Sequence, residues 1–321
     1  MRLLLSLALL AGSGLAAAAI NLVSSDQQSA DHPLVRAVEY MGQQLAQRSK
    51  GELQLSVKAN GALGSEQEVL KALMEGRHAM ARVNLGILGD RSPAATLASL
   101  PYLFRSPDHM WKVLDGEFGQ RLDREMEQLG LVRLSYLDSA PRNFYCLKPI
   151  RAQADFKGRK IRVLQSQVFE DMIGNLGASP VPMPFNKVAE AMRSGEVDCA
   201  EGNVVNFVAA EHYKVAPWLI QDEHLLIPEV LLISKKVWLT LNDAQKEALR
   251  QSSADARSFL AKQWAEQESS ALAVARKAGV TIITRNQISM GGIEAQAMKT
   301  YNKYLKAGAD LETVMRIMTT K

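Results

Sequence analysis

The fold is decided between residues 229 and 278, where EVLLIS (229–234) is followed by NDAQKEALRQSSADARSFLAKQWAEQESSALAVARKA (242–278). The first run is apolar without alternation, which is typical of a fully buried central strand. The second carries one apolar stripe at helical spacing, with Asn242 and Gln245 as a cap pair and Gly279 as a stop. An uninterrupted helix of this span would be roughly 50 Å long, more than one small domain needs. We therefore expect the helix to pack across two domains and the strand to return the chain to the first.

Before this region, strand patterns alternate with helical ones. A helix pattern over 33–45 opens with Pro33, and a second over 69–74 is closed by Gly76. Strand patterns lie around these helices at 19–23, 53–57 and 80–88. The alternation predicts mostly parallel sheets covered by helices on both faces, and it makes the first 140 residues one α/β unit.

A second α/β unit begins near Arg142. Asn186 is placed to cap a short helix over 186–194, and Gly195 to end it. The prolines of SPVPMP (179–184) force an extended approach to Phe185. The unit's other patterns are the strands NFYCL (143–147), KIRVL (160–164) and EVDCA (196–200), a helix over 168–176, and a helical stretch over 292–318.

The N-terminal sequence is typical of an export signal. Residues 1–19, MRLLLSLALLAGSGLAAAA, place one basic residue before a leucine-rich run and end in small residues. A membrane anchor is the alternative, but the leucine-rich run is far shorter than the roughly 20 apolar residues that a bilayer span needs. We expect cleavage near Ala18 or Ala19 and a periplasmic product.

Composition excludes several classes of protein. The chain has 321 residues, 47% hydrophobic and 22% charged, within the ordinary range for globular proteins. The 38 Lys+Arg and 34 Asp+Glu residues give a net charge of +4 without a basic run, so we expect no nucleic-acid partner. Cys146 and Cys199 lack metal-site spacing, and a disulfide and two buried thiols are both open. We expect no metal and no cofactor.

Two arginines stand out because they lie within strand patterns: Arg142 in SAPRNFY and Arg162 in KIRVLQS. Charged side chains are rarely buried without a partner, and a guanidinium in a desolvated cleft binds a carboxylate in a bidentate manner. The alternatives are an internal ion pair with a glutamate such as Glu201, or an edge strand facing water. The chain has no GxSxG, HExxH, GxxxxGK[ST], GxGxxG or CxxC motif, which disfavours an enzyme.

Together these residues belong to motifs that resemble the solute-binding proteins of tripartite ATP-independent periplasmic (TRAP) transporters. The motifs are LGSEQEVLKAL, LPYLFRSPDHMWKVLDGEFG, PRNFY, DFKGRKIRVLQS, GASPVPMPFNKVAEAM, GEVDCAEGN and PEVLLISKKVW, in the family's order and spacing. The resemblance covers the whole mature chain. It implies a two-lobed α/β periplasmic-binding-protein fold, with a ligand cleft between the lobes and a long helix spanning both. We expect lobe I at 20–140 plus about 229–268, and lobe II at 141–228 plus about 269–321.

The resemblance also implies ligand-binding residues. Arg162 is similar to the family's carboxylate-binding arginine, and Arg142 to a second arginine that contacts the substrate. Asn203 becomes the candidate amide donor, because Gly202 stands where the most similar subgroup has asparagine. The remaining candidates are the polar Gln165 just beyond Arg162, the aromatic Phe185, the first-lobe residues Glu66 and Asn84 that meet the polar end of the ligand, and His32 at the start of the first helix.

The motifs look most like the subgroup that binds hexuronates such as glucuronate and galacturonate. The resemblance then implies a non-enzymatic receptor that hands its ligand to the small and large membrane subunits of a TRAP permease. A C4-dicarboxylate or sialic acid would need the same arginine anchor, so other acids stay open. The alternatives from other classes are a periplasmic sugar-acid enzyme, with Glu66 or Glu201 as acid or base, and a sensor subunit that docks onto a membrane receptor kinase.

Overall fold

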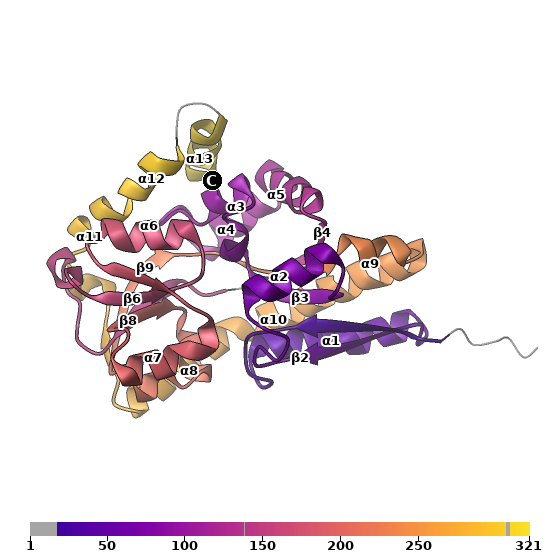
Figure 1. The fold of residues 1–321 in the computed structure, drawn as a ribbon, viewed down its shortest axis with the longest axis horizontal. Coiled ribbons are helices and arrows are strands. Elements are labelled where there is room, and N and C mark those ends of the chain that lie inside the picture. Colours follow the sequence, from indigo (N-terminus) through magenta and orange to yellow (C-terminus); the bar gives the residue numbers. More distant parts are fainter. Residues whose placement is uncertain (1–17, 138, 306–308) are drawn as a thin grey trace, which may run out of the picture.

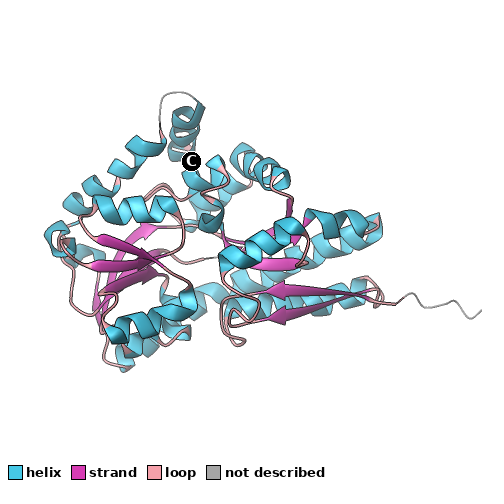
Figure 2. Cartoon of the chain, viewed as in Figure 1, coloured by secondary structure: helices cyan, strands magenta, loops and turns pink. Residues whose placement is uncertain are grey.

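The protein, described by a computed structural model over residues 18–137, 139–305 and 309–321, contains two β-sheets flanked by helices (Figures 1 and 2). The strand orders are β2-β1-β3-β10-β4 and β11-β9-β5-β8-β6-β7. The predicted signal at 1–19 lies almost entirely outside the described residues. Within them, none of the helices combines the length and apolar character needed to cross a membrane.

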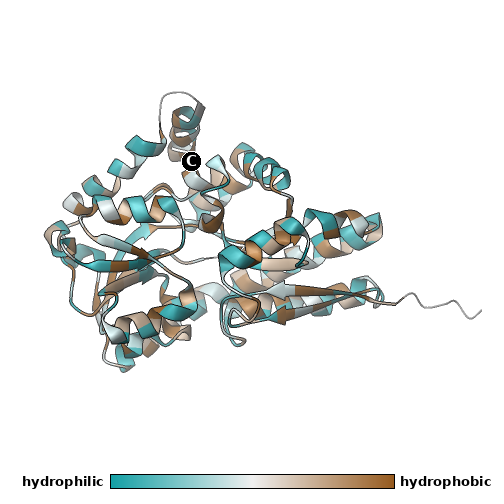
Figure 3. Cartoon of the chain, in the orientation of Figure 1, coloured by the Kyte–Doolittle hydropathy of each residue, from teal (hydrophilic) through white to brown (hydrophobic). Residues whose placement is uncertain are grey.

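The first sheet is built mainly from the N-terminal part of the chain. Its strands are largely hydrophobic, whereas the surrounding helices carry hydrophilic as well as hydrophobic residues (Figure 3). Its strands are β1 (Ile20–Ser25), β2 (Leu53–Lys58), β3 (Met80–Asn84), β4 (Leu131–Leu137) and β10 (Glu229–Ser234). Its helices are α1 (Pro33–Arg48), α2 (Glu66–Glu75), α3 (Pro93–Ala98), α4 (Pro107–Leu114), α5 (Glu117–Gln128) and α9 (Lys235–Thr240), with the 3-10 turn η1 (Leu85–Leu88).

The second sheet takes the middle of the chain and one later strand. Its strands are β5 (Arg142–Cys146), β6 (Lys160–Val163), β7 (Ser179–Pro182), β8 (Cys199–Gly202), β9 (Trp218–Leu225) and β11 (Thr281–Ile283). Its helices are α6 (Gln167–Asn175), α7 (Val188–Ser194), α8 (Val204–Ala209), α11 (Met290–Ala297) and α12 (Lys299–Tyr304). Its 3-10 turns are η2 (Gln153–Phe156), η3 (Phe185–Lys187), η4 (His212–Lys214) and η5 (Arg285–Gln287).

The long helix confirms the prediction from residues 242–278. Helix α10 (Asp243–Lys277) packs on α1 and β4 of the first unit and on α8 of the second. Asn242 and Gln245 form the predicted capping box, and β10 pairs between β3 and β4 as a returning strand should. Apolar residues along α10 therefore pack against both units and join them.

The contacts of the last helix indicate the lobe to which it belongs. Helix α13 (Ala309–Thr319) contacts α4 and its flank, because His109 Nε2 lies 2.8 Å from the carbonyl oxygen of Ile317. Arg121 of α5 also bonds Asp310 at 3.0 Å. We therefore propose that α13 moves with lobe I, although the sequence-based division placed 269–321 in lobe II.

The prediction of mostly parallel sheets is confirmed, with one reversed strand in each sheet. Strand β10 runs antiparallel to both of its neighbours, and so does β5 in the second sheet. Both strands follow directly on a crossing between the units, after β9 and β4. A chain that enters a sheet at the edge where the other strands end must run antiparallel to those strands. The alternation of strands and helices in the sequence does not reveal where such a crossing occurs.

Two local predictions need correction. The strand expected over 80–88 ends at Asn84, whose side chain accepts a hydrogen bond from the backbone N–H of Gly86 and begins the turn η1. Asn186 does not cap the next short helix: it lies inside η3, and Lys187 precedes α7 without a side-chain cap. Gly195 does end α7, with a φ of 76° that favours glycine.

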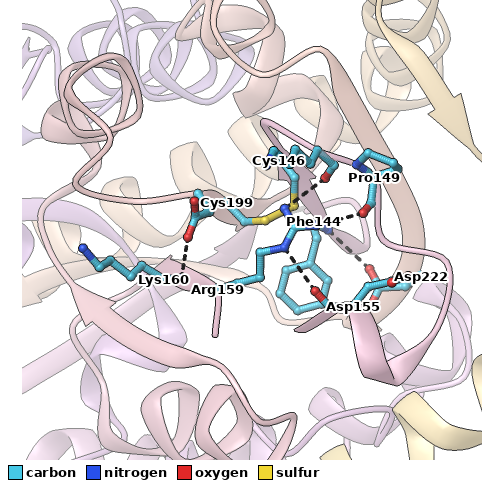
Figure 4. The surroundings of a disulfide bond; sticks show 10 residues. Phe144, Cys146, Pro149, Asp155, Arg159, Lys160, Cys199 and Asp222 are labelled. Carbon is cyan, nitrogen blue, oxygen red and sulfur yellow. Dashed lines mark hydrogen bonds between the residues drawn. A yellow bond between two sulfur atoms is a disulfide. The ribbon is translucent and has the colours of Figure 1, made fainter. Parts of the chain in front are cut away.

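The two cysteines form a disulfide between neighbouring strands (Figure 4). Cys146 of β5 and Cys199 of β8 face each other directly, with a Cα–Cα distance of 4.0 Å. The backbone N–H of Leu147 donates to the carbonyl oxygen of Asp198, so the cysteines occupy a non-hydrogen-bonded pair, where side chains lie closest. The bridge fixes the register of the two strands whose opposite ends carry Arg142 and Glu201.

Candidate functional site

Both sheets bring charged residues to the edge at which the two units meet. Asn84 ends β3, and Glu229, opposite it, begins the antiparallel β10. In the second sheet Arg142 begins β5, while Arg162 lies one residue before the end of β6. Ligands of open α/β sheets bind outside the carboxyl ends of the strands, so this shared edge is the candidate cleft.

Arg162 is the least compensated of the buried arginines at this edge. It is 1% exposed, and its Nε and Nη2 donate to the carbonyl oxygen of Met183 at 3.1 and 2.7 Å. No carboxylate of residues 18–137, 139–305 or 309–321 lies within 4.0 Å of its guanidinium. Burial accordingly lowers the pKa of Arg162. A dry guanidinium with a carbonyl and no acid as partner is suited to an anionic ligand.

Arg142 instead has an acid of its own. Its Nε and Nη2 donate to the two carboxylate oxygens of Glu201 at 2.5 and 2.8 Å. This is the ion pair that the sequence left open, and among the described residues only Nε and Nη2 of Arg142 make hydrogen bonds. Burial opposes ionisation of Glu201, but Arg142 holds the pKa of that carboxyl well below its usual range.

His224 and Asp222 extend this ion pair. His224 Nδ1 lies 3.0 Å from Asp222, and its Nε2 lies 3.7 Å from Glu201. Although burial acts to lower it, the two carboxylates raise the pKa of His224 to about 9. The ring is therefore a cation at neutral pH, and the cluster of Arg142, Glu201, His224 and Asp222 has balanced charge.

The opposite wall of the cleft holds Arg82 and three carboxylates. Arg82, buried in β3, donates to both oxygens of Asp26 and, at 2.7 Å, to Glu229. Glu66, the first residue of α2, accepts from the backbone N–H of Asn84 at 3.1 Å and lies 3.8 Å from Arg82. Burial raises the pKa of Glu66 to about 7, against the opposing effects of Arg82 and Arg162. Glu66 and Arg162 thus influence each other across the cleft.

Three of the predicted residues serve as helix caps. Asn84 caps η1 and donates to Glu229, and Asn203 caps α8 by accepting from the backbone N–H of Asn206 at 2.8 Å. His32 caps α1 through Nδ1, so its Nε2 carries the proton and donates to the side-chain oxygen of Asn206 at 2.9 Å. Burial lowers the pKa of His32 to about 4, which keeps the ring neutral in this bridge between the units.

Gln165 lies at the rim of the cleft. Its carbonyl oxygen accepts from Gln67 Nε2 of the first unit at 2.9 Å, and Asp90 accepts from the backbone N–H of Gln167 at 3.0 Å. Gly86 of the first unit packs closely against Phe169 of the second: a Cβ atom added at Gly86 would lie 2.8 Å from the phenylalanine ring. Because these contacts join the two units around a buried Arg162, the structure is in a closed conformation.

Aromatic side chains cover Arg162. Phe185 lies with its ring centre 5.7 Å from the guanidinium carbon and packs on His212, with ring centres 5.0 Å apart. His212 in turn bonds the hydroxyl of Tyr145 at 2.9 Å, and burial lowers its pKa to about 3. Sequence reasoning missed His212, His224 and Arg82 as members of this candidate site. Arg82 carries the same signal as Arg162, an arginine between small and branched apolar residues in MARVN.

Comparisons with known proteins show the family of the chain. Residues 24–307 match the family described as bacterial extracellular solute-binding protein, family 7. A solute-binding protein of Chromohalobacter salexigens is 28% identical, with 88% of this chain and 84% of that protein covered.

Two solved structures share the fold closely. A TRAP periplasmic solute-binding protein from Bradyrhizobium sp. BTAi1, in complex with D-galacturonate, is 37% identical with a TM-score of 0.89. One from Roseobacter denitrificans, with bound β-D-glucuronate, is 31% identical with a TM-score of 0.90. In both cases 94% of this chain and 100% of the other are covered. The chain therefore belongs to family 7 of the bacterial extracellular solute-binding proteins and is a TRAP solute-binding protein.

Proposed function

We propose that this protein is a periplasmic receptor for a hexuronate, such as galacturonate or glucuronate, which it delivers to the small and large membrane subunits of a TRAP permease. Arg162 carries the proposal, because it is a buried guanidinium at the cleft edge without a carboxylate within 4.0 Å among the described residues. The uronates bound in the two related structures have the carboxylate that this arginine would pair with. Relatives from Escherichia coli and Vibrio cholerae are named periplasmic binding proteins, which supports the compartment.

The other residues divide into contact and positioning roles. Arg142 offers Nη1 to the ligand, Phe185 packs on the apolar face of the sugar ring, and Glu66 accepts hydroxyl hydrogen bonds. Gln165 closes the rim over the bound acid. Asn84, Asn203 and His32 act mainly by capping the elements that shape the cleft.

An enzymatic role has one observation in its favour, the pKa of Glu66 near 7, which suits a general acid. Glu201 cannot share that role, since Arg142 keeps it ionised. We propose that the protein is not an enzyme. Incubation with galacturonate and glucuronate followed by mass spectrometry should return both acids unchanged, and a new product would favour the enzyme.

A thermal-shift screen tests the receptor proposal. A ligand that binds only the folded state raises the melting temperature, by about 5 °C at 100 times its dissociation constant for a protein of this size. We expect this shift with D-galacturonate or D-glucuronate and none with D-galactose or D-glucose, which lack the carboxylate. A flat response to both uronates, sialic acid, C4-dicarboxylates and keto acids would contradict the proposal.

Export is tested on the same preparation. Expression of the full chain with export to the periplasm should give a mature protein that begins after Ala18 or Ala19, as read by intact-mass spectrometry. Retention of residues 1–19 in the periplasmic fraction would contradict the predicted cleavage.

A further inference from the structure

The wall of lobe I is negative where it faces the cleft. Arg82 is the one cation in the group of Asp26, Glu66, Glu229 and itself, and all four are nearly or fully withdrawn from water. With Asp26 and Glu229 ionised, the group has a formal charge of −1 when Glu66 is protonated and −2 when it is ionised. Glu66 is the member of the group that Arg162 affects across the cleft.

The wall of lobe II is positive. Arg142 and Glu201 neutralise each other, as do His224 and Asp222. Arg162 adds one positive charge that no carboxylate within 4.0 Å balances in the described part of the chain. The closed cleft therefore has a positive pole at Arg162 and a negative pole at Glu66.

We propose that Glu66 makes the receptor selective for acids with a single carboxylate, because it rejects a second carboxylate at the far end of the ligand. This inference rests on the proposed function, since it assumes that Arg162 binds the first carboxylate. A hydroxyl group at the far end donates a hydrogen bond to Glu66 and is accepted. A carboxylate there would be buried against Glu66 and Glu229, and like charges brought together without water are strongly disfavoured.

Two open-chain acids can be compared to measure the rejection of a second carboxylate alone. L-Galactonate and galactarate have the same six carbons and the same hydroxyl configuration, but the first ends in a hydroxymethyl group and the second in another carboxylate. Titration calorimetry at pH 8 should show galactarate binding at least ~100-fold more weakly than L-galactonate. Equal or tighter binding of galactarate would overturn the inference, while the receptor proposal would stand. Failure of D-galacturonate, D-glucuronate and L-galactonate alike would instead contradict the receptor proposal.

The variant Glu66→Gln keeps the shape of the side chain and removes its charge. We expect the ratio of the galactarate and L-galactonate dissociation constants to fall at least tenfold in this variant. Glu39→Gln, an exposed position on α1 in the same lobe, should leave the ratio unchanged. If neither open-chain acid binds the wild type while D-galacturonate does, galactarate binding gained by Glu66→Gln supports the inference, and its continued absence overturns it.

The pH dependence provides a second readout. Glu66 is faced by Arg82 from β3, Glu229 from β10, the backbone of Asn84 and Arg162 from β6, and its pKa is raised by burial to about 7. Raising the pH from 6 to 8 ionises Glu66, whereas sugar carboxylates are already ionised at pH 6. Discrimination against galactarate should therefore grow over this range in the wild type and stay constant in Glu66→Gln. A constant ratio in the wild type would contradict the role of Glu66.

Discussion

Arg162 differs from the other buried arginines of the cleft in what neutralises it. Arg82 and Arg142 each hold a bidentate carboxylate, and their pKa values are raised although burial acts to lower them. Arg162 has a backbone carbonyl instead, and its pKa is lowered. A buried charge without a counter-ion costs free energy that a ligand carboxylate recovers on binding. In the proposed function, the unfavourable environment of Arg162 thus provides affinity for an acid.

His224 gives a prediction for stability. Its pKa of about 9 in the folded protein exceeds the ordinary value of 6.5, so its contribution is complete below pH 6.5 and is lost as the pH rises through 9. The free energy of unfolding should fall by about 3 kcal/mol between pH 6.5 and 9.5, as measured by urea titration. His224→Gln should remove this fall and His78→Gln should keep it. A wild-type curve that is flat over this range would contradict the charged histidine.

The site residues differ in how far sequence reveals them. Arg142 and Arg162 are visible because arginine is rare within apolar strands, and Arg82 in MARVN satisfied the same criterion without being singled out. His212 and His224 carry no such signal, because their partners Tyr145 and Glu201 are distant in sequence. His224 meets Glu201 across 23 positions of chain, and no spacing rule anticipates that contact.

At the scale of elements, strand ends and helix caps make up the cleft. The predicted capping box of α10 and the glycine stops of α2 and α7 were confirmed, because caps depend on neighbouring residues. Mostly parallel sheets were predicted correctly, but the reversed direction of β10 and β5 was not, because it depends on where the chain crosses between the lobes. The cleft also contains helix caps. Each of Asn84, His32 and Asn203 caps an element at the point where that element meets the cleft.

The disulfide between β5 and β8 gives a prediction at this scale. It links cysteines 53 positions apart, and the chain-entropy argument assigns about 4 kcal/mol of stability to a loop of this length. Cys146→Ala combined with Cys199→Ala should lower the free energy of unfolding by about this amount in urea titration. Reduction of the wild-type protein should give a similar loss. Unchanged stability in both experiments would show that the bridge does not constrain the unfolded chain.

For the whole molecule, we propose that function depends on closure of the two lobes. The long helix α10, the crossing β4 to β5 and the crossing β9 to β10 connect them (Figure 1). Because Arg162 is 1% exposed, we propose that a ligand reaches it when the lobes separate, and that a ligand touching both walls shifts the population toward the closed form. Contacts made only in the closed form therefore contribute to affinity without touching the ligand.

Asp90 is such a contact, because it caps the first turn of α6 from the opposite lobe. A helix cap contributes about 1 kcal/mol, so Asp90→Ala should weaken uronate binding about fivefold in calorimetry. The free energy of unfolding should change little, since the open form does not use the contact. Asp108→Ala removes an exposed acid of lobe I and serves as the control. Equal affinities of both variants and the wild type would exclude a role in closure.

The most direct test of the account is the binding of D-galacturonate to Arg162→Met, measured by titration calorimetry beside the wild type. Methionine fills much of the space of the arginine stem, and circular dichroism verifies that the variant is folded. Arg133→Ala is the control, because Arg133 holds a bidentate carboxylate, Asp123, near the start of β4. We predict that Arg162→Met binds at least ~100-fold more weakly, as expected for loss of a buried charged partner, and that Arg133→Ala binds like the wild type. Wild-type affinity in folded Arg162→Met would contradict the central claim that Arg162 anchors the ligand.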